Sequence, residues 1–308
     1  MKQLKNRRKR VLSSILSLFL LLLLSLTACS AGHVPLQETD TEVPPDALIV
    51  NEAEVVDGIR QGLKEHAATI TVRFSLSQEL EGSPAQIVSD WVEKALEETD
   101  APDEGDYIRY QYGGYTFESY TSQENGIYRY RVVLTPDYYD WLFEAEEASA
   151  KAQEIVSGFG FDPDTDDLTK IETVYRFVCE TIRYDKVHKK NPYYHLKSTA
   201  YSALVQHTAT CQGFCTALYR LLRESGISCR IVTGQTKEEG SEELHSWVIV
   251  PLDGLWYALD PAWDAGKDDW QWFLKGSESL QERIPSEAFS TGEFRTRFPM
   301  AVQDYGSI

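Results

Sequence analysis

The most constraining feature of this sequence is the dipeptide Asp253-Gly254, which separates two runs rich in β-branched and aromatic residues. Asp-Gly between such runs is a strong signal for a hairpin with a two-residue turn. If the loop contains only these two residues, counting outward along both strands brings Trp247 opposite Asp260. His245 then shares a face with Asp260 as its diagonal neighbour, at a separation of roughly 7–8 Å that the two side chains can close. The hairpin therefore predicts a hydrogen-bonded His–Asp pair.

A second constraint is the position of Cys211. Apolar residues at helical spacing follow it and Gly226 is a natural stop, so the sequence predicts a helix that starts at Cys211. The apolar stripe consists of Phe214, Leu218, Leu221 and Leu222. At a helix start, unpaired N–H groups and the positive end of the dipole favour thiolate over thiol. A cysteine placed there and facing a His–Asp pair has the nucleophile, base and orienting group that thiol acyl transfer requires.

These residues resemble the bacterial transglutaminase-like proteins, whose core belongs to the papain-like thiol enzymes. The matching stretch runs from about Leu168 to Leu274. Its motifs are Tyr184-Asp185, Thr199-Ala200-Tyr201-Ser202-Ala203-Leu204, Cys211-Gln212-Gly213-Phe214, Gly226-Ile227, Gly234, His245-Ser246-Trp247, Trp256-Tyr257-Ala258-Leu259-Asp260 and Trp263-Asp264. The resemblance implies an α+β fold in which a helix bearing the cysteine packs on an antiparallel sheet bearing the histidine and aspartate. It also implies a thioester intermediate formed on protein or peptide amides, and no metal or organic cofactor.

Carried over position by position, the resemblance assigns three catalytic roles. Cys211 is the nucleophile, His245 is the general base and acid, and Asp260 orients His245. The Cys211 backbone N–H is a candidate oxyanion donor, and Tyr201 or Gln206 could supply a side-chain donor. The triad leaves the acceptor open, because attack by an amine gives a transglutaminase and attack by water gives a protease or amidase.

Two further interpretations of the same residues stay open. One is a degenerate surface domain that binds without catalysis. The other is a metal site at His207, Cys211 and Cys215, which would align on one helical face if the helix began early. Without metal, Cys215 is expected to pack beneath the site, and Cys179 and Cys229 are expected to be buried free thiols.

The N-terminal segment 1–28 has the pattern of a secretion signal. Its basic residues are Lys2, Lys5, Arg7, Arg8, Lys9 and Arg10. The apolar run Val11–Leu26 that follows is shorter than the ~20 residues of a membrane-spanning helix. Leu26-Thr27-Ala28-Cys29 resembles the lipobox of bacterial lipoproteins, which implies lipidation at Cys29 and a location on the outer face of the membrane or cell envelope. An ordinary signal peptide and a single-span anchor are the alternatives.

The remainder divides into three predicted parts: a flexible tether over 29–45, a small α+β domain over 46–160 and a transglutaminase-like domain over 161–308. In the small domain the sequence predicts a strand over 69–76, a helix opened by Pro84 and a hairpin at Asn125-Gly126. In the second domain, Thr169 and Glu172 form a possible capping box for a helix that starts near Leu168, and 227–233 reads as a strand.

The net charge of the chain indicates which classes of binding partner to expect. The chain has a net charge of -18, and residues 1–28 hold six of the thirty basic residues but no acidic one. Acidic residues therefore outnumber basic ones two to one in the rest of the chain. Such a body repels phosphate backbones, which argues against nucleic acid as a partner. The expected partners are a protein or peptide substrate at the cell surface and the membrane, through the lipid anchor.

Overall fold

A computed structural model describes residues 51–80, 83–238 and 241–306. The predicted signal segment, the lipidation residue Cys29 and the tether lie outside these ranges. Among the residues that are described, no helix has both the length and the apolar character needed to cross a membrane.

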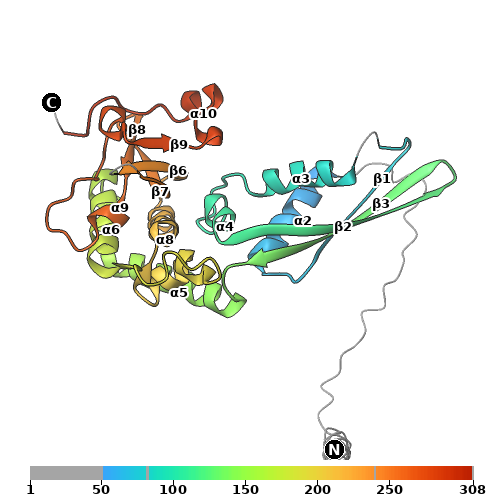
Figure 1. Ribbon diagram of the computed structural model, residues 1–308, viewed down its shortest axis with the longest axis horizontal. Coiled ribbons are helices and arrows are strands. Elements are labelled where there is room, and N and C mark those ends of the chain that lie inside the picture. The colour runs from blue at the N-terminus through green and yellow to red at the C-terminus, as the bar shows by residue number, and fades with distance from the viewer. Residues whose placement is uncertain (1–50, 81–82, 239–240, 307–308) are drawn as a thin grey trace, which may run out of the picture. The chain divides into compact units, whose positions relative to one another are not determined.

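The N-terminal lobe is a three-stranded antiparallel sheet with two helices packed against it (Figure 1). Its elements are α2 (Glu52–Lys64), β1 (Ile70–Leu76), α3 (Pro84–Ala95), α4 (Asp106–Arg109), β2 (Tyr112–Glu124) and β3 (Ile127–Tyr138), and the strand order is β1-β3-β2. Pro84 opens α3 as predicted, and the Ser83 hydroxyl caps it by accepting a hydrogen bond from the Ala85 N–H. The predicted strand and the hairpin at Asn125-Gly126 are confirmed by β1 and by the β2–β3 pairing.

The C-terminal lobe combines helices with a four-stranded antiparallel sheet of order β8-β7-β6-β9. Its helices are α5 (Leu142–Phe159), α6 (Asp167–Thr181), α7 (Ala200–Leu204), α8 (Cys211–Glu224), α9 (Pro261–Asp264) and α10 (Gly292–Arg297). Its strands are β4 (Arg183–Tyr184), β5 (Thr208–Ala209), β6 (Arg230–Glu238), β7 (Ser241–Leu252), β8 (Leu255–Leu259) and β9 (Arg283–Pro285). The short strands β4 and β5 pair in parallel, and the 3-10 turns η1 (His195–Ser198), η2 (Ser277–Leu280) and η3 (Glu287–Phe289) complete the lobe. The α+β prediction, with a Cys-bearing helix on an antiparallel sheet, is confirmed.

Helix α8 lies against β7 and β6, where it forms the centre of the larger core (Figure 1). Side chains of β7 alternate between the two faces of the sheet. Val248 and Val250 pack into the core that contains α8, whereas Trp247 and Ile249 join a smaller cluster with Phe298 on the other face. Because its apolar stripe packs on a sheet, α8 holds its first residue, Cys211, at a fixed place beside β7.

Helix α6 starts at Asp167, close to the predicted Leu168, but its predicted cap and the predicted bounds of one strand are wrong. Helix α6 is capped by Asp166, whose side chain accepts a hydrogen bond from the Thr169 N–H (2.9 Å), and not by a capping box of Thr169 and Glu172. The Glu172 carboxylate instead pairs with Arg176 one turn on (2.6 Å), so it does not reach back to the helix start. The strand expected over 227–233 begins at Arg230 and continues to Glu238, because β7 and β9 pair with it over that longer range.

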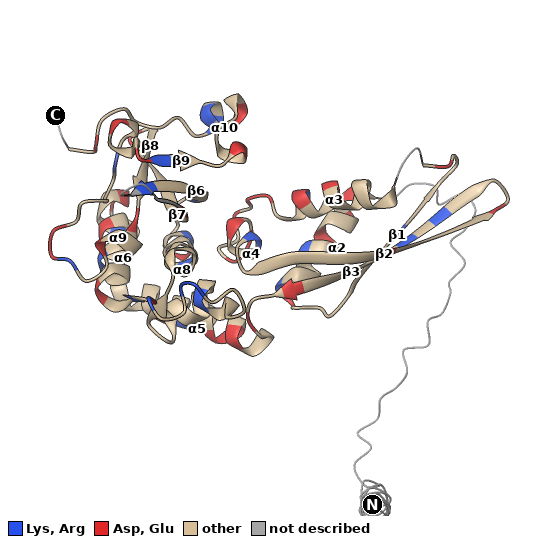
Figure 2. Ribbon diagram, in the orientation of Figure 1, with Lys and Arg blue, Asp and Glu red and all other residues tan. Residues whose placement is uncertain are grey.

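Buried polar contacts join the two lobes, and residues 45–308 form one unit. The Asp106 carboxylate is fully buried and accepts hydrogen bonds from the Arg230 side chain (2.8 and 3.1 Å) and from the Ile231 N–H (2.8 Å). The Tyr219 hydroxyl on α8 donates to Glu98 (2.5 Å). Asp and Glu residues lie on helices of both lobes, α3 and α5 among them, so the acidic excess is not confined to one element (Figure 2).

Candidate active site

Cys211 is the first residue of α8, as the sequence predicts. The residue before it, Thr210, is fixed by a hydrogen bond from its N–H to the Lys197 carbonyl (2.9 Å). Two residues further on, a Cβ at Gly213 would lie 2.7 Å from the Ala209 Cβ and 2.9 Å from the Lys197 oxygen. The first turn of α8 can therefore approach this backbone only with glycine at 213. The Cys211 side chain stays half-buried, whereas the other three described cysteines are buried.

The β7–β8 hairpin places the His–Asp pair. Asp253 and Gly254 have φ values of 52° and 83°, which is the left-handed conformation of a two-residue hairpin turn, and the register runs outward to Val248 opposite Leu259. Nε2 of His245 donates a hydrogen bond to Oδ2 of Asp260 at 2.7 Å, and both side chains are buried. The hydrogen bond predicted from the hairpin is therefore present.

Arg283 is a second partner of the Asp260 carboxylate, and the sequence did not indicate it. Its Nη2 donates to Asp260 Oδ2, and its side chain is only 1% exposed. The guanidinium carbon lies 3.5 Å from the ring centroid of Trp272 and 4.4 Å from that of Trp263. No local pattern marks this arginine, because it lies 23 residues from Asp260 on another strand and outside the motif-bearing stretch.

Cys211, His245, Asp260 and Arg283 interact, and the pKa values of the first three are shifted in favour of the charged forms. Burial disfavours the imidazolium, but the Asp260 carboxylate and the Cys211 thiol outweigh it and raise the pKa of His245 to about 9. Burial also opposes the thiolate, yet hydrogen bonds with His245 and Ser246 hold the pKa of Cys211 below the ordinary thiol value. Burial would raise the pKa of Asp260, but His245 and Arg283 lower it. The site thus favours the thiolate, the imidazolium and the carboxylate more strongly than water does.

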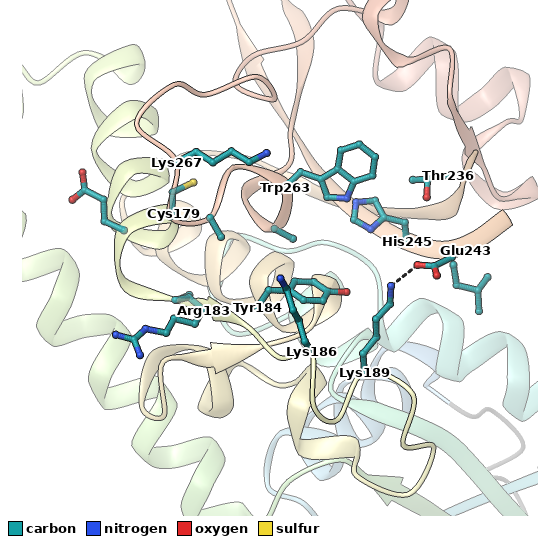
Figure 3. A pocket seen from close by; sticks show the side chains of 16 residues that line it. Cys179, Arg183, Tyr184, Lys186, Lys189, Thr236, Glu243, His245, Trp263 and Lys267 are labelled. Atoms are coloured by element: carbon teal, nitrogen blue, oxygen red, sulfur yellow. Dashed lines mark hydrogen bonds and ion pairs between the residues drawn. The ribbon is translucent and has the colours of Figure 1, made fainter. Parts of the chain in front are cut away.

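A cavity of about 540 Å³ opens beside His245. Its lining comprises Cys179, Glu180, Ile182, Arg183, Tyr184, Lys186, Lys189, Thr236, Glu243, Leu244, His245, Ala262, Trp263, Ala265, Gly266 and Lys267. Tyr184 and Lys186 lie on one side of it and His245 and Trp263 on the other (Figure 3). Lys189 reaches across to Glu243, which ties the segment after β4 to strand β7. A substrate that enters this cavity meets the His245 ring directly.

The structure changes which side chain is best placed as an oxyanion donor. Tyr184 lines the cavity and lies against Cys211; burial raises its pKa, and the neighbouring Cys211 raises it further, so its hydroxyl stays protonated. Tyr201 belongs to α7, and the Gln206 side chain accepts a hydrogen bond from Ser202 (3.4 Å). Neither is among the described residues that line the cavity, and Cys211 itself is not among them either, so what distinguishes Tyr184 is its contact with Cys211. Tyr184 could have been singled out from the sequence only by its motif position.

The structure also shows where the other cysteines and the residues of the predicted metal site lie. Cys179, Cys215 and Cys229 are buried free thiols, as expected, and burial raises the pKa of Cys215 well above the ordinary value. Because α8 begins at Cys211, His207 is not on the helix; it lies in a turn with φ of 56°. The described residues contain no group of three or more His, Cys, Asp or Glu that could hold a metal ion.

Comparisons with known proteins agree with this architecture. A family model described as the transglutaminase-like superfamily matches residues 152–261. Kyphoscoliosis peptidase of Mus musculus is 27% identical over 143 residues, which are 42% of this chain and 21% of the mouse protein. The Homo sapiens protein is 27% identical over 136 residues, 41% of this chain and 20% of its own length. The chain thus spans about a fifth of the length of these curated relatives.

Solved structures include two similar chains. A crystal structure of a TGase has a TM-score of 0.33 and 19% identity, over 67% of this chain and 55% of that chain. The periplasmic domain of TgpA from Pseudomonas aeruginosa has a TM-score of 0.26 and 17% identity, over 50% of this chain and 69% of that one. The family match over residues 152–261, which include the Cys-bearing helix and the His–Asp hairpin, leads to the conclusion that this chain carries a domain of the transglutaminase-like superfamily.

Proposed function

We propose that this chain is a thiol acyl-transfer enzyme that acts on amides of proteins or peptides, with Cys211, His245 and Asp260 as its catalytic triad. The observation that carries the proposal is the half-buried Cys211 at the start of α8, hydrogen-bonded to a histidine whose Nε2 is bonded to a buried carboxylate. This is the arrangement of nucleophile, base and orienting group needed to form and resolve a thioester.

In the proposed first step, the Cys211 thiolate attacks the carbonyl carbon of an amide. The developing oxyanion is met by the Cys211 backbone N–H, which has no partner within the helix and lies against the Tyr184 oxygen, and by the Tyr184 hydroxyl. The C–N bond then breaks, and the His245 imidazolium gives its proton to the departing amine, which leaves a thioester on Cys211. Asp260 keeps the ring in the orientation and tautomer that this transfer requires.

In the second step, a primary amine attacks the thioester while His245 takes up its proton, and the thiolate is released. If water attacks instead, the same residues perform hydrolysis. This second candidate is favoured by one observation: the curated relatives that the chain matches are named as peptidases. The triad is common to both reactions, so the acceptor must be decided by experiment.

The test is to incubate the purified protein with a protein mixture and a labelled primary amine, and to analyse the products by mass spectrometry. Amine incorporation or cross-linking supports acyl transfer, and cleavage alone supports hydrolysis. Cys211→Ser is the control and should abolish either product. If wild type and Cys211→Ser give the same products, or if the protein only retains partners without modifying them, the enzymatic proposal fails and the binding-domain interpretation replaces it.

We also propose that Cys29 carries a lipid anchor that holds the enzyme on the outer face of the membrane. The proposal is supported by the short apolar run that ends in the lipobox-like Leu26-Thr27-Ala28-Cys29. Multiple acyl chains would hold the acidic globule firmly, whereas a single chain anchors only marginally. Wild type should sediment with membranes, and Cys29→Ala should be released or remain an unprocessed precursor. Unchanged processing and distribution of Cys29→Ala would exclude the anchor.

A further inference from the structure

We propose that Arg283 is a positioning residue of the active site, which acts through Asp260 on His245 and Cys211. The inference rests on the proposed function, because it assigns a role within the same triad. Its basis is geometric: Arg283 Nη2 and His245 Nε2 both donate to the same oxygen, Oδ2 of Asp260, and the arginine and aspartate side chains are 1% and 2% exposed. Arg283 lies 22 residues beyond the end of the family match at residue 261.

The fold holds Arg283 in place from two directions. On the strand side, Gly234 of β6 faces His245 on β7 and Pro285 on β9. A Cβ at Gly234 would collide with the Ile284 carbonyl oxygen, so β9 can come this close only because residue 234 is glycine. Gly234, which pairs with His245, is thus also the residue that lets the strand bearing Arg283 approach the active site.

On the other side, two tryptophans form a corner that the guanidinium packs against. Trp272 and Trp263 contact it with their ring faces, and their own rings meet edge to face at 5.1 Å. Trp263 also lies 5.6 Å from the His245 ring, and the Asp260 N–H donates to the Trp272 carbonyl (3.0 Å). A cation in contact with aromatic faces is stabilised without needing water, which suits a charge buried this deeply.

The charges in this cluster alternate. Cys211 as thiolate, His245 as imidazolium, Asp260 as carboxylate and Arg283 together carry no net charge. The other titratable groups near the cluster include Tyr175 and Cys179 on α6, Tyr184 on β4, Cys215 on α8, Glu243 on β7 and the buried Asp264 on α9, which accepts from the Tyr175 hydroxyl and the Trp272 N–H. Burial raises the pKa of the first four and keeps them neutral, and Glu243 is paired with Lys189. Arg283 is therefore the counter-charge that lets two anions coexist around one histidine.

Loss of the guanidinium charge should make thiolate formation harder, because an uncompensated negative charge then remains next to Cys211. The acid limb of Cys211 alkylation is the pH range in which the alkylation rate rises as the thiol ionises. In Arg283→Gln, which keeps a hydrogen-bond donor but no charge, we expect this acid limb to move up by about one pH unit. Arg283→Lys keeps the charge but not the planar fork. Its acid limb should stay within about 0.3 pH units of wild type even if its turnover falls.

The experiment measures the rate of Cys211 alkylation by iodoacetamide between pH 4 and 10 in the full-length protein, with the labelled residue identified by mass spectrometry. The matched control is Arg230→Gln, which removes another largely buried arginine. Arg230 lies on β6, the strand that pairs with β9, and it is bonded to the carboxylate of Asp106. This control variant should lower the melting temperature and leave the acid limb unchanged. If Arg283→Gln does not fold, Arg283→Met, which fills the same space, takes its place.

The outcomes separate the two proposals. An upward shift in Arg283→Gln but not in Arg283→Lys or Arg230→Gln supports the positioning role. An acid limb that does not move in Arg283→Gln or Arg283→Met, while that of wild type lies below the ordinary thiol range, overturns it and leaves the triad intact. A wild-type acid limb in the ordinary thiol range contradicts the ion-paired triad itself, and the role of Arg283 falls with it.

Discussion

Replacement of Asp260 by asparagine should cost both stability and turnover, and the structure gives the size of each. The Asp260 carboxylate is the hydrogen-bonded counter-ion of Arg283, whose side chain is 1% exposed. Removing one member of a buried ion pair costs about 3–5 kcal/mol, because the remaining charge is left uncompensated in the interior. Since two tryptophan faces still contact the guanidinium and the amide oxygen of the asparagine can still accept, we expect the lower end, about 3 kcal/mol.

For a protein of this size, a loss of about 3 kcal/mol corresponds to a drop of roughly 6–12 °C in melting temperature. Turnover should fall much further. The amide in Asp260→Asn would favour the wrong imidazole tautomer, and the analogous change in a serine triad lowers turnover by about 10⁴-fold. Melting temperature is measured by circular dichroism, and turnover by amine incorporation into a protein substrate.

Two variants separate the stability effect from the catalytic one. Asp260→Asn with Arg283→Met removes the orphaned charge, so most of the lost stability should return while turnover stays low. Asp106→Asn leaves Arg230 without its closest carboxylate partner, away from the active site, and should lower the melting temperature with much less effect on turnover. The reasoning is refuted if Asp260→Asn melts like wild type, or if the double variant is less stable than the single one.

The remaining predictions concern the nucleophile, the pH profile and the strand that carries Arg283. His245→Ala should reduce labelling of Cys211 by an electrophilic probe at pH 6 by at least about tenfold, since the imidazolium holds the thiol pKa down; equal labelling would contradict the ion pair. Turnover should follow a bell-shaped pH profile. It should rise as Cys211 ionises, at a pH below the ordinary thiol range, and fall as the pH rises through about 9, because His245 then loses the proton that the departing amine needs. A profile that still rises above pH 9 would be inconsistent with this role. Gly234→Ala should lower the free energy of unfolding by about 2 kcal/mol or more in urea titrations, because its Cβ would meet the Ile284 carbonyl. Gly292→Ala is the control and should not lower it, because a Cβ there meets no atom within 4 Å. Equal unfolding curves for the two variants would argue against the close approach of β9.

The parts of the site that could be predicted are those set by local chain geometry. A two-residue turn fixes the register of both strands, so the hydrogen bond between His245 and Asp260 followed from counting outward from Asp253-Gly254. Helix periodicity and the stop at Gly226 placed Cys211 at a helix start in the same way. Both signals lie within about fifteen residues of the groups that they position.

The parts that could not be predicted depend on contacts between segments that are distant in sequence. Arg283 reaches Asp260 through a strand that joins the sheet at β6, and nothing in a three-residue strand reveals its partner. Tyr184 comes beside Cys211 because β4 pairs with β5, just before α8. The capping residue of α6 was missed for a different reason: Asp166 and Thr169 are both acceptable caps, and the backbone conformation at Asp166 selects between them.

The contacts of Asp106 bear on where this protein can be cut. Asp106 belongs to the N-terminal lobe, yet it supplies the carboxylate for Arg230 and an acceptor for the Ile231 N–H inside the sheet that also carries His245. A fragment trimmed to the family match, which begins at residue 152, would leave both donors without this acceptor at the start of strand β6. It would also lose the Tyr110 carbonyl that accepts from Gln212, the residue after Cys211 (2.6 Å). Expression of the transglutaminase-like segment alone should therefore give an unstable product, and the shortest chain that keeps this sheet intact must begin upstream of Asp106.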